Sequence, residues 1–183
     1  MRIVGGIWRG RKLIAPPGQG TRPTADRVRQ ALFDMMMHAE WGGRALIEGA
    51  HVLDVFAGTG ALGLEALSRG AATACFIEQD PAALRALRAN IVACKAEDRA
   101  EIFPADALMV KANTGNAANI VLLDPPYGRT LVARALTRLR GGGWVSSDAL
   151  IVVETPGDER LADEPLLAER QYGASRVSVF RAA

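Results

Sequence analysis

The chain of 183 residues is 49% hydrophobic and 23% charged, which is typical of a folded single domain and excludes a mainly disordered protein. No uncharged apolar run approaches the ~18 residues that a membrane helix requires, and charges interrupt the N-terminus too early for a secretory signal, so we expect a cytoplasmic protein. The net charge of +2 hides an asymmetry: residues 1–30 hold seven basic residues and one acidic residue (+6), and the remainder holds 15 basic and 19 acidic residues (−4). A basic arm of this kind occurs both in nucleic-acid-binding proteins and on ordinary solvated surfaces.

The N-terminal part is predicted to form a strand pair, a loop and a helix. Residues 2–15 contain two short apolar stretches separated by glycines, which predicts the strand pair. Residues 16–20 (PPGQG) predict the loop. Thr24 or Asp26 can cap a helix that runs to about His38. The apolar residues of that helix recur at helical spacing and are Val28, Ala31, Leu32, Met35 and Met36.

From His51 onward the pattern alternates between strands and helices. The predicted strands are 51–56, 73–78, 100–103, 119–124 and 149–154. The predicted helices are 61–69, 82–94 and 129–139. Strands such as 120–123 are apolar on both faces, as in a parallel sheet that is covered on both sides. Residues 166–172 and 175–181 predict a terminal hairpin, so we expect an α/β fold with a doubly wound, mostly parallel sheet and an antiparallel edge.

A glycine-rich turn follows the first predicted strand of the sheet. It has the pattern GxGxxG at Gly58, Gly60 and Gly63, between a strand and a helix, and such a turn lets a nucleoside cofactor approach the backbone. Glu78 ends the next strand and can accept hydrogen bonds from ribose hydroxyls. Asp54 ends the first strand, where a carboxylate would oppose a pyrophosphate. The cofactor that suits this acid carries an amine and a sulfonium, which indicates S-adenosylmethionine.

A second motif lies at the end of the predicted strand 119–124 and reads Asp124, Pro125, Pro126, Tyr127. Two prolines fix the backbone and remove two N–H donors, so the motif presents a carboxylate and carbonyls beside an aromatic ring. These acceptors suit an exocyclic NH₂ group on a planar base, on which Tyr127 would stack. We assign the catalytic role to these four residues.

The cysteines and histidines do not form a metal-binding pattern. Cys75 and Cys94 are too few and too far apart for a zinc site. His38 and His51 have no carboxylate or second histidine at ligand spacing. We therefore expect no metal cofactor.

These motifs together resemble the RsmD-type methyltransferases, a bacterial family that methylates N2 of guanine 966 in 16S rRNA. The resemblance extends through nearly the whole chain, except roughly 128–170. The matching pieces are RIVGG (2–6), RGRKL (9–13), TRPT (21–24), DRVR (26–29), DVFAGTGALGLEALSRGA (54–71), Glu78, DAL (106–108) and DPPY (124–127). The stretch 62–71 is specific to this family, whereas DPPY is shared with other amino-methyltransferases, including DNA adenine enzymes.

The resemblance implies the class I methyltransferase fold and a set of site residues. S-adenosylmethionine would be bound by Asp54, Phe56, Gly58 and Gly60, with Glu78 on the ribose and Asp106 near the adenine. The basic N-terminal residues would contact rRNA phosphates, and they are Arg9, Arg11, Lys12, Arg22 and Arg27. We accordingly divide the chain into an RNA-binding extension, residues 1–23, and a methyltransferase domain, residues 24–183.

The expected function is methyl transfer to the exocyclic N2 amine of a guanine in small-subunit rRNA. Two alternatives stay open: a DNA adenine-N6 methyltransferase, and a non-catalytic rRNA-binding assembly factor. The substrate could be free rRNA, an assembly intermediate or the finished subunit. We expect a monomer, since no apolar stripe is left over.

Overall fold

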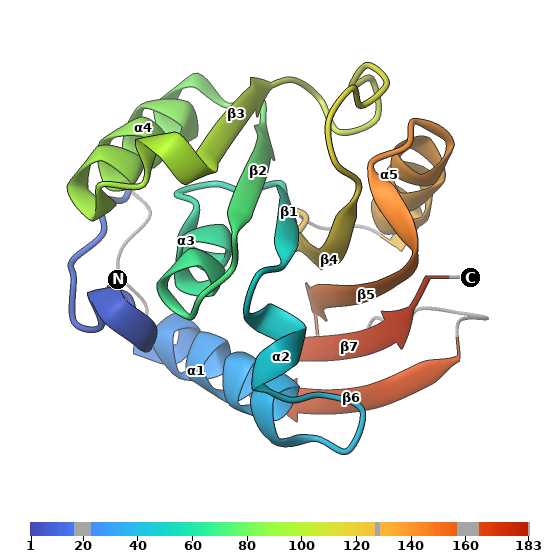
Figure 1. Cartoon of the computed structure of the whole chain (residues 1–183), viewed down its shortest axis with the longest axis horizontal. Helices are drawn as coiled ribbons and strands as arrows, with labels where there is room; N and C mark the ends of the chain where they lie inside the picture. The colour runs from blue at the N-terminus through green and yellow to red at the C-terminus, as the bar shows by residue number, and fades with distance from the viewer. Residues whose placement is uncertain (17–22, 127–128, 157–164, 183) are drawn as a thin grey trace.

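The computed structural model describes residues 1–16, 23–126, 129–156 and 165–182. A single seven-stranded sheet forms its centre, with the strand order β3-β2-β1-β4-β5-β7-β6 (Figure 1). The strands are β1 (His51–Val55), β2 (Thr73–Glu78), β3 (Ala100–Pro104), β4 (Ala118–Leu123), β5 (Val145–Pro156), β6 (Leu166–Tyr172) and β7 (Ser175–Arg181). The first five are parallel to one another, and β7 pairs antiparallel with both β5 and β6. The predicted doubly wound sheet with an antiparallel terminal hairpin is confirmed.

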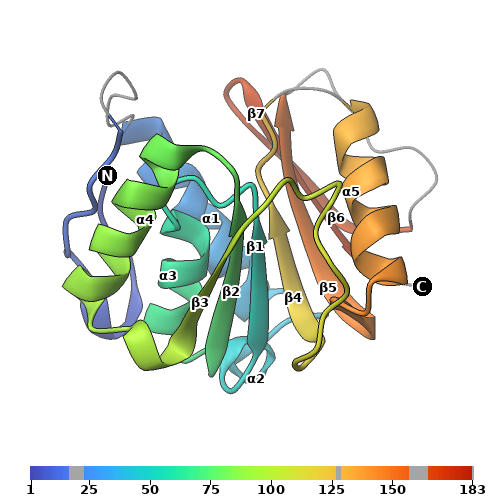
Figure 2. The ribbon, with the colours of Figure 1, turned by 90° about the horizontal axis from the view of Figure 1, so that it is seen from above.

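Helices cover both faces of the sheet (Figure 2). They are α1 (Pro23–His38), α2 (Arg44–Ile47), α3 (Ala61–Ser68), α4 (Pro81–Cys94) and α5 (Arg129–Gly141), with short 3₁₀ turns at η1 (Gly6–Trp8) and η2 (Glu97–Arg99). One face carries α1, α3, α4 and the N-terminal segment, and the other face carries α5. Two layers of helix around one sheet give the α/β sandwich that the alternating sequence pattern predicts.

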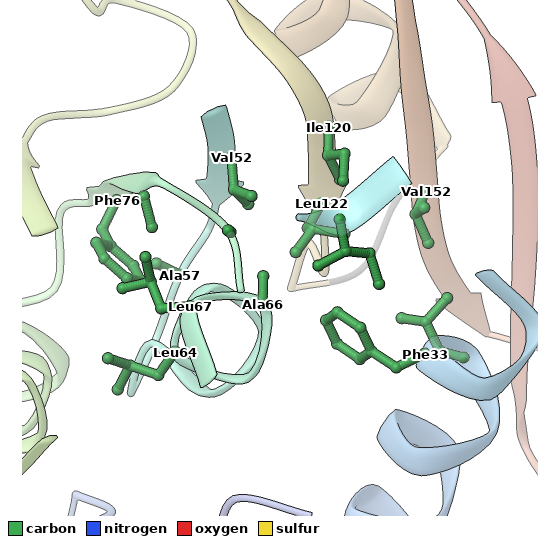
Figure 3. Close-up of a cluster of buried hydrophobic side chains, with 14 of the residues drawn as sticks. Phe33, Val52, Ala57, Leu64, Ala66, Leu67, Phe76, Ile120, Leu122 and Val152 are labelled. Atoms are coloured by element: carbon green, nitrogen blue, oxygen red, sulfur yellow. The ribbon is translucent and has the colours of Figure 1, made fainter. Parts of the chain in front are cut away.

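The core divides into two clusters because side chains alternate across a strand. On β1, Val52 packs toward α1, α3 and α4, whereas Leu53 and Val55 pack toward α5. Phe33 of α1 is fully buried and reaches the sheet near Leu122 (Figure 3). Phe33 is not part of the apolar face predicted for this helix, although it is among the largest fully buried side chains of the described residues.

Two predicted elements at the N-terminus differ from the structure. The strand pair expected at residues 2–15 is present only as one antiparallel bridge, Arg2 to Lys12, because η1 occupies the connection. The first helix begins at Pro23, earlier than the predicted Thr24 or Asp26, since proline is compatible with a first helical turn. Most of the predicted loop, at 17–20, lies outside the described residues.

Residues 1–16 are packed onto α3 and α4. Ile3 is fully buried. The Val4 amide donates to Glu65 Oε2 at 2.8 Å, and the Trp8 amide donates to Ser68 Oγ at 2.9 Å. Farther along, the Ile14 amide donates to Asn90 Oδ1 at 2.7 Å. The start of the chain is therefore held by buried polar side chains of the domain that follows it.

Candidate functional site

Carboxylates gather at the carboxyl edge of the parallel sheet. Asp54 and Glu78 belong to the last residues of β1 and β2. The register pairs Val55 with Leu123 and Leu123 with Val153, so Asp124, just after β4, lies beside Glu154 near the end of β5. In open α/β sheets this edge is where ligands bind.

The glycine-rich turn after β1 has an unusual backbone. Phe56, Gly58 and Gly60 all have positive φ, at 59°, 56° and 77°, and a non-glycine residue such as Phe56 in this region is strained. A Cβ at Gly60 would lie 2.3 Å from Leu87 Cδ1, whereas Gly58 has open space around it. Gly60 therefore permits close helix packing, and Gly58 leaves the backbone accessible.

Asp54 is buried and holds the start of α3. Its Oδ2 accepts a hydrogen bond from the Gly63 amide at 2.8 Å, which fixes the turn against β1. Burial raises the pKa of Asp54 well above its ordinary value, the Gly63 hydrogen bond lowers it, and the charges of Asp124 and Glu78 raise it again. A cation placed at this edge would relieve that repulsion.

Glu78 is held rigidly by three backbone amides. Its Oε1 accepts from Gln79 and Asp80, each at 2.8 Å, and its Oε2 accepts from Gly58 at 2.7 Å. A carboxylate oxygen has two acceptor sites, so Oε2 keeps one for a further donor. The acid predicted to hold a ribose is thus fixed to the glycine turn and retains acceptor capacity there.

The remaining predicted cofactor residue, Asp106, follows β3 on the same edge. Its Oδ1 accepts from the Leu108 amide at 2.9 Å, and this bond closes the turn at 107–109. Asp106 therefore has a local structural role beside the role that the family resemblance implies.

The second motif follows β4 directly. Asp124 is exposed and Pro125 is buried, while Tyr127 lies outside the described residues. Although Asp124 has an exposed surface, many protein atoms surround its carboxyl, and this desolvation raises its pKa to about 7, with the charge of Glu154 as the second cause. Near neutral pH, Asp124 can therefore gain or lose a proton.

The basic N-terminal residues fall into two groups. Arg9, Arg11, Lys12 and Arg27 are exposed, and Arg22 lies outside the described residues. Two other arginines of the +6 stretch form ion pairs within the fold. Arg29 is buried, with Nη2 2.8 Å from Asp26 Oδ1 and Nε 3.5 Å from Glu65 Oε2, and Arg2 Nε lies 3.9 Å from Asp26 Oδ2.

Within the described ranges, no three His, Cys, Asp or Glu side chains are grouped so that they could bind a metal ion. No helix in the same ranges combines the length and apolarity needed to cross a bilayer.

Comparison with known proteins identifies the family. The family model described as "Conserved hypothetical protein 95" matches residues 1–181. The chain belongs to this family, the RsmD family. It is 43% identical over 165 residues to "Ribosomal RNA small subunit methyltransferase D" of Escherichia coli, covering 90% of this chain and 79% of that protein.

Solved structures show the same fold. The "Putative methyltransferase yhhF" from Escherichia coli superposes with a TM-score of 0.82 at 39% identity, covering 100% of this chain and 97% of that one. An RNA methyltransferase from Salinibacter ruber, solved with S-adenosyl-L-homocysteine, has a TM-score of 0.66 at 15% identity, covering 88% and 92%. This chain therefore has the class I methyltransferase fold predicted from its sequence.

Sequence reasoning missed Glu154 and Asn90. Glu154 follows the apolar run 149–153 just as Asp124 follows the apolar run 120–123, so the same pattern could have identified it. Asn90 is fully buried, and its amide group donates to the carbonyls of Ile14 and Thr59 at 3.0 Å each. Nothing in the helical pattern distinguishes Asn90 from an ordinary surface asparagine.

Proposed function

We propose that the protein transfers the methyl group of S-adenosylmethionine to the exocyclic N2 amine of a guanine in 16S rRNA. The observation that supports this most directly is the acceptor-only turn at Asp124–Pro125–Pro126, one strand away from the glycine turn of β1. The named relatives are small-subunit rRNA methyltransferases, which favours rRNA over DNA as the substrate.

The residues present fit S-adenosylmethionine. Gly58 leaves open space at the turn, and Glu78 Oε2 keeps one acceptor site for a ribose hydroxyl. Asp54, Glu78 and Asp124 suit a cofactor that carries a sulfonium and an ammonium, because these cations would favour the ionised carboxylates that burial and mutual repulsion disfavour. When bound, the cofactor supplies an electrophilic methyl group.

The protein's own residues orient the amine and accept the proton that it releases. The lone pair of guanine N2 is delocalised into the ring, so the amine is a weak nucleophile. The Asp124 carboxylate and the Pro125 carbonyl accept the two amine hydrogens, which draws electron density toward nitrogen. Asp124, with a pKa of about 7, is suited to receive the proton that leaves after methyl transfer. Catalysis is then mainly positioning and electrostatic stabilisation.

The target base must leave its stack to reach this turn. Enzymes that modify base edges act on unpaired or flipped nucleotides, and folded rRNA presents such bases in loops. The exposed Arg9, Arg11, Lys12 and Arg27 would contact phosphates and set the register.

Asp124→Ala tests the assignment. We expect turnover to fall by about 10²–10⁴-fold, with S-adenosylmethionine affinity by calorimetry within a few-fold of wild type. Glu97→Ala, an exposed acid on η2, serves as the control and keeps full activity. The assay measures labelled methyl incorporation into naked 16S rRNA, small subunits and duplex DNA, followed by mapping of the modified nucleotide. Incorporation into DNA alone would favour the adenine-N6 alternative, and RNA binding without cofactor binding would favour the assembly factor.

A further inference from the structure

One face of α4 presents a stripe of exposed residues without any acid. Its exposed members at helical spacing are Pro81, Arg85, Arg88, Val92 and, just past the helix, Lys95. Residues three and four apart lie on the same side of a helix. No Asp or Glu occurs from 81 to 96, so no acid within this stretch offsets the three cations.

The N-terminal segment lies antiparallel along this helix. The Arg11 guanidinium donates to the carbonyl of Ala93 near the end of α4, and the Ile14 amide donates to Asn90 one turn earlier. Continuing in the same direction, Ile14, Ala15 and Pro16 face the first half of α4. The segment that carries Arg9, Arg11 and Lys12 therefore runs beside α4 (Figure 2).

A hollow of about 180 Å³ lies between residues 14–16 and the first part of α4. It is lined by Ile14, Ala15, Pro16, Ala82, Arg85, Ala86 and Ala89. Its walls are aliphatic except for the guanidinium of Arg85. Ile14 and Val92, which are 56% and 59% exposed, add apolar area beside the cations.

This surface leads to the cofactor edge of the sheet. Helix α4 begins at its N-cap, Asp80, whose side chain accepts from the Ala83 amide at 2.7 Å. The Asp80 amide donates to Glu78, which in turn binds the glycine turn at Gly58. A strand of RNA that follows α4 from Lys95 to Pro81 would thus reach the cofactor edge at Glu78 after about 20 Å, two strands away from Asp124.

We propose that the α4 surface, with Arg85, Arg88, Lys95 and Arg11, binds a single-stranded stretch of the rRNA substrate, and that the hollow beside Ile14 receives one unpaired base. The inference rests on the proposed function for its substrate. The three cations of α4 together with Arg11 complement the phosphate backbone. The aliphatic walls bury the faces of a base, and the Arg85 guanidinium can stack on it.

The double substitution Arg85→Ala with Arg88→Ala tests the cationic part. The matched control, Arg134→Ala with Arg170→Ala, removes the same charge from exposed positions on α5 and the distant strand β6. Binding of a naked 16S rRNA fragment is measured from 50 to 200 mM salt. For two single-strand phosphate contacts we expect the salt slope to decrease by about 1.4, with about tenfold weaker binding, a raised KM and an unchanged kcat. The control keeps the wild-type slope.

Ala89→Leu tests the hollow, because it fills the space without changing charge. We expect weaker RNA binding by a few-fold with an unchanged salt slope, whereas Ala133→Leu on the exposed side of α5 has no effect. Unchanged slope and affinity in both α4 variants, while wild-type protein methylates rRNA, would overturn this inference and leave the proposed function intact. A defect seen only on assembled subunits would assign the surface to a ribosomal protein and overturn it as well. Failure of wild-type protein to methylate any rRNA would instead refute the proposed function.

Discussion

Replacement of Glu65 by glutamine removes the charge at the centre of the N-terminal packing. The Glu65 side chain is 0% exposed, Arg69 is 7% exposed and Arg29 is 5% exposed. Glu65 Oε1 accepts from Arg69 Nε at 2.8 Å, and Glu65 Oε2 accepts from the Val4 amide at 2.8 Å. A glutamine has only one acceptor oxygen, so its NH₂ group would face one of these two donors. One buried N–H would lose its partner, and two buried guanidiniums would lose their shared counter-charge.

The loss in the free energy of unfolding caused by Glu65→Gln can be bounded. Breaking one partner of a buried ion pair costs about 3–5 kcal/mol, and the lower end applies because Arg29 keeps Asp26 at 2.8 Å. For a chain of this length, a loss of about 3 kcal/mol lowers Tm by roughly 6–12 °C. Glu48→Gln is the matched control, since its pair with Arg44 is exposed, with side chains 53% and 74% accessible. Exposed pairs contribute about 0–1 kcal/mol.

Thermal unfolding followed by calorimetry, with urea unfolding as a second measure, compares the two variants. If Glu65→Gln melted within about 2 °C of the wild type and of Glu48→Gln, the buried charge would not be holding the N-terminal segment. The reasoning that links burial to stability here would then be refuted.

The carboxylates at the sheet edge give two further predictions. The pKa of Asp124 is about 7 in the folded protein and about 4 in the unfolded chain. Between these values the folded protein keeps a proton that the unfolded chain releases. Asp124 therefore lowers the free energy of unfolding progressively as pH rises from about 4 to 7. Asp124→Asn should therefore melt above wild type at pH 8, with a smaller difference at pH 5; a lower melting temperature at pH 8 would contradict this. Since the proposed reaction needs ionised Asp124, kcat/KM should rise with pH around a midpoint near 7. Glu154→Gln should move that midpoint to lower pH, whereas Glu101→Gln, at the opposite edge of the sheet, should not. An unmoved midpoint in Glu154→Gln would show that Glu154 does not raise the pKa of Asp124.

Local patterns predicted the sheet well because each signal lies within one segment. Apolar runs bounded by glycine or an acid gave strand limits within a residue or two, although β5 begins at Val145 rather than 149. The acids that end such runs, Glu78 and Asp124, were found in the same way. The register then brings those strand ends to one edge, as the parallel topology requires.

Pairings between distant segments could not be predicted in this way. Arg29 counts toward the basic arm by sequence, yet it is buried beside Glu65, because a buried carboxylate requires a cation. The predicted strand pair at 2–15 is largely replaced by hydrogen bonds to α3 and α4. The partner groups of these bonds lie 60 or more residues away in the sequence, so the pattern of residues 2–15 cannot indicate them. For the same reason, deleting residues 1–20 would remove Ile3 from the core as well as the basic side chains, so point substitutions are the better test of RNA binding.

The packing of residues 1–16 also has a consequence for the order in which the protein is made. Val4, Trp8 and Ile14 find their partners 61, 60 and 76 residues later in the chain. At about 5–20 residues per second, the ribosome delivers those partners several seconds after the N-terminus has emerged. The basic segment therefore acquires its final arrangement only after α3 and α4 have been synthesised, so a nascent chain shorter than this lacks the α4 surface on which RNA would be bound.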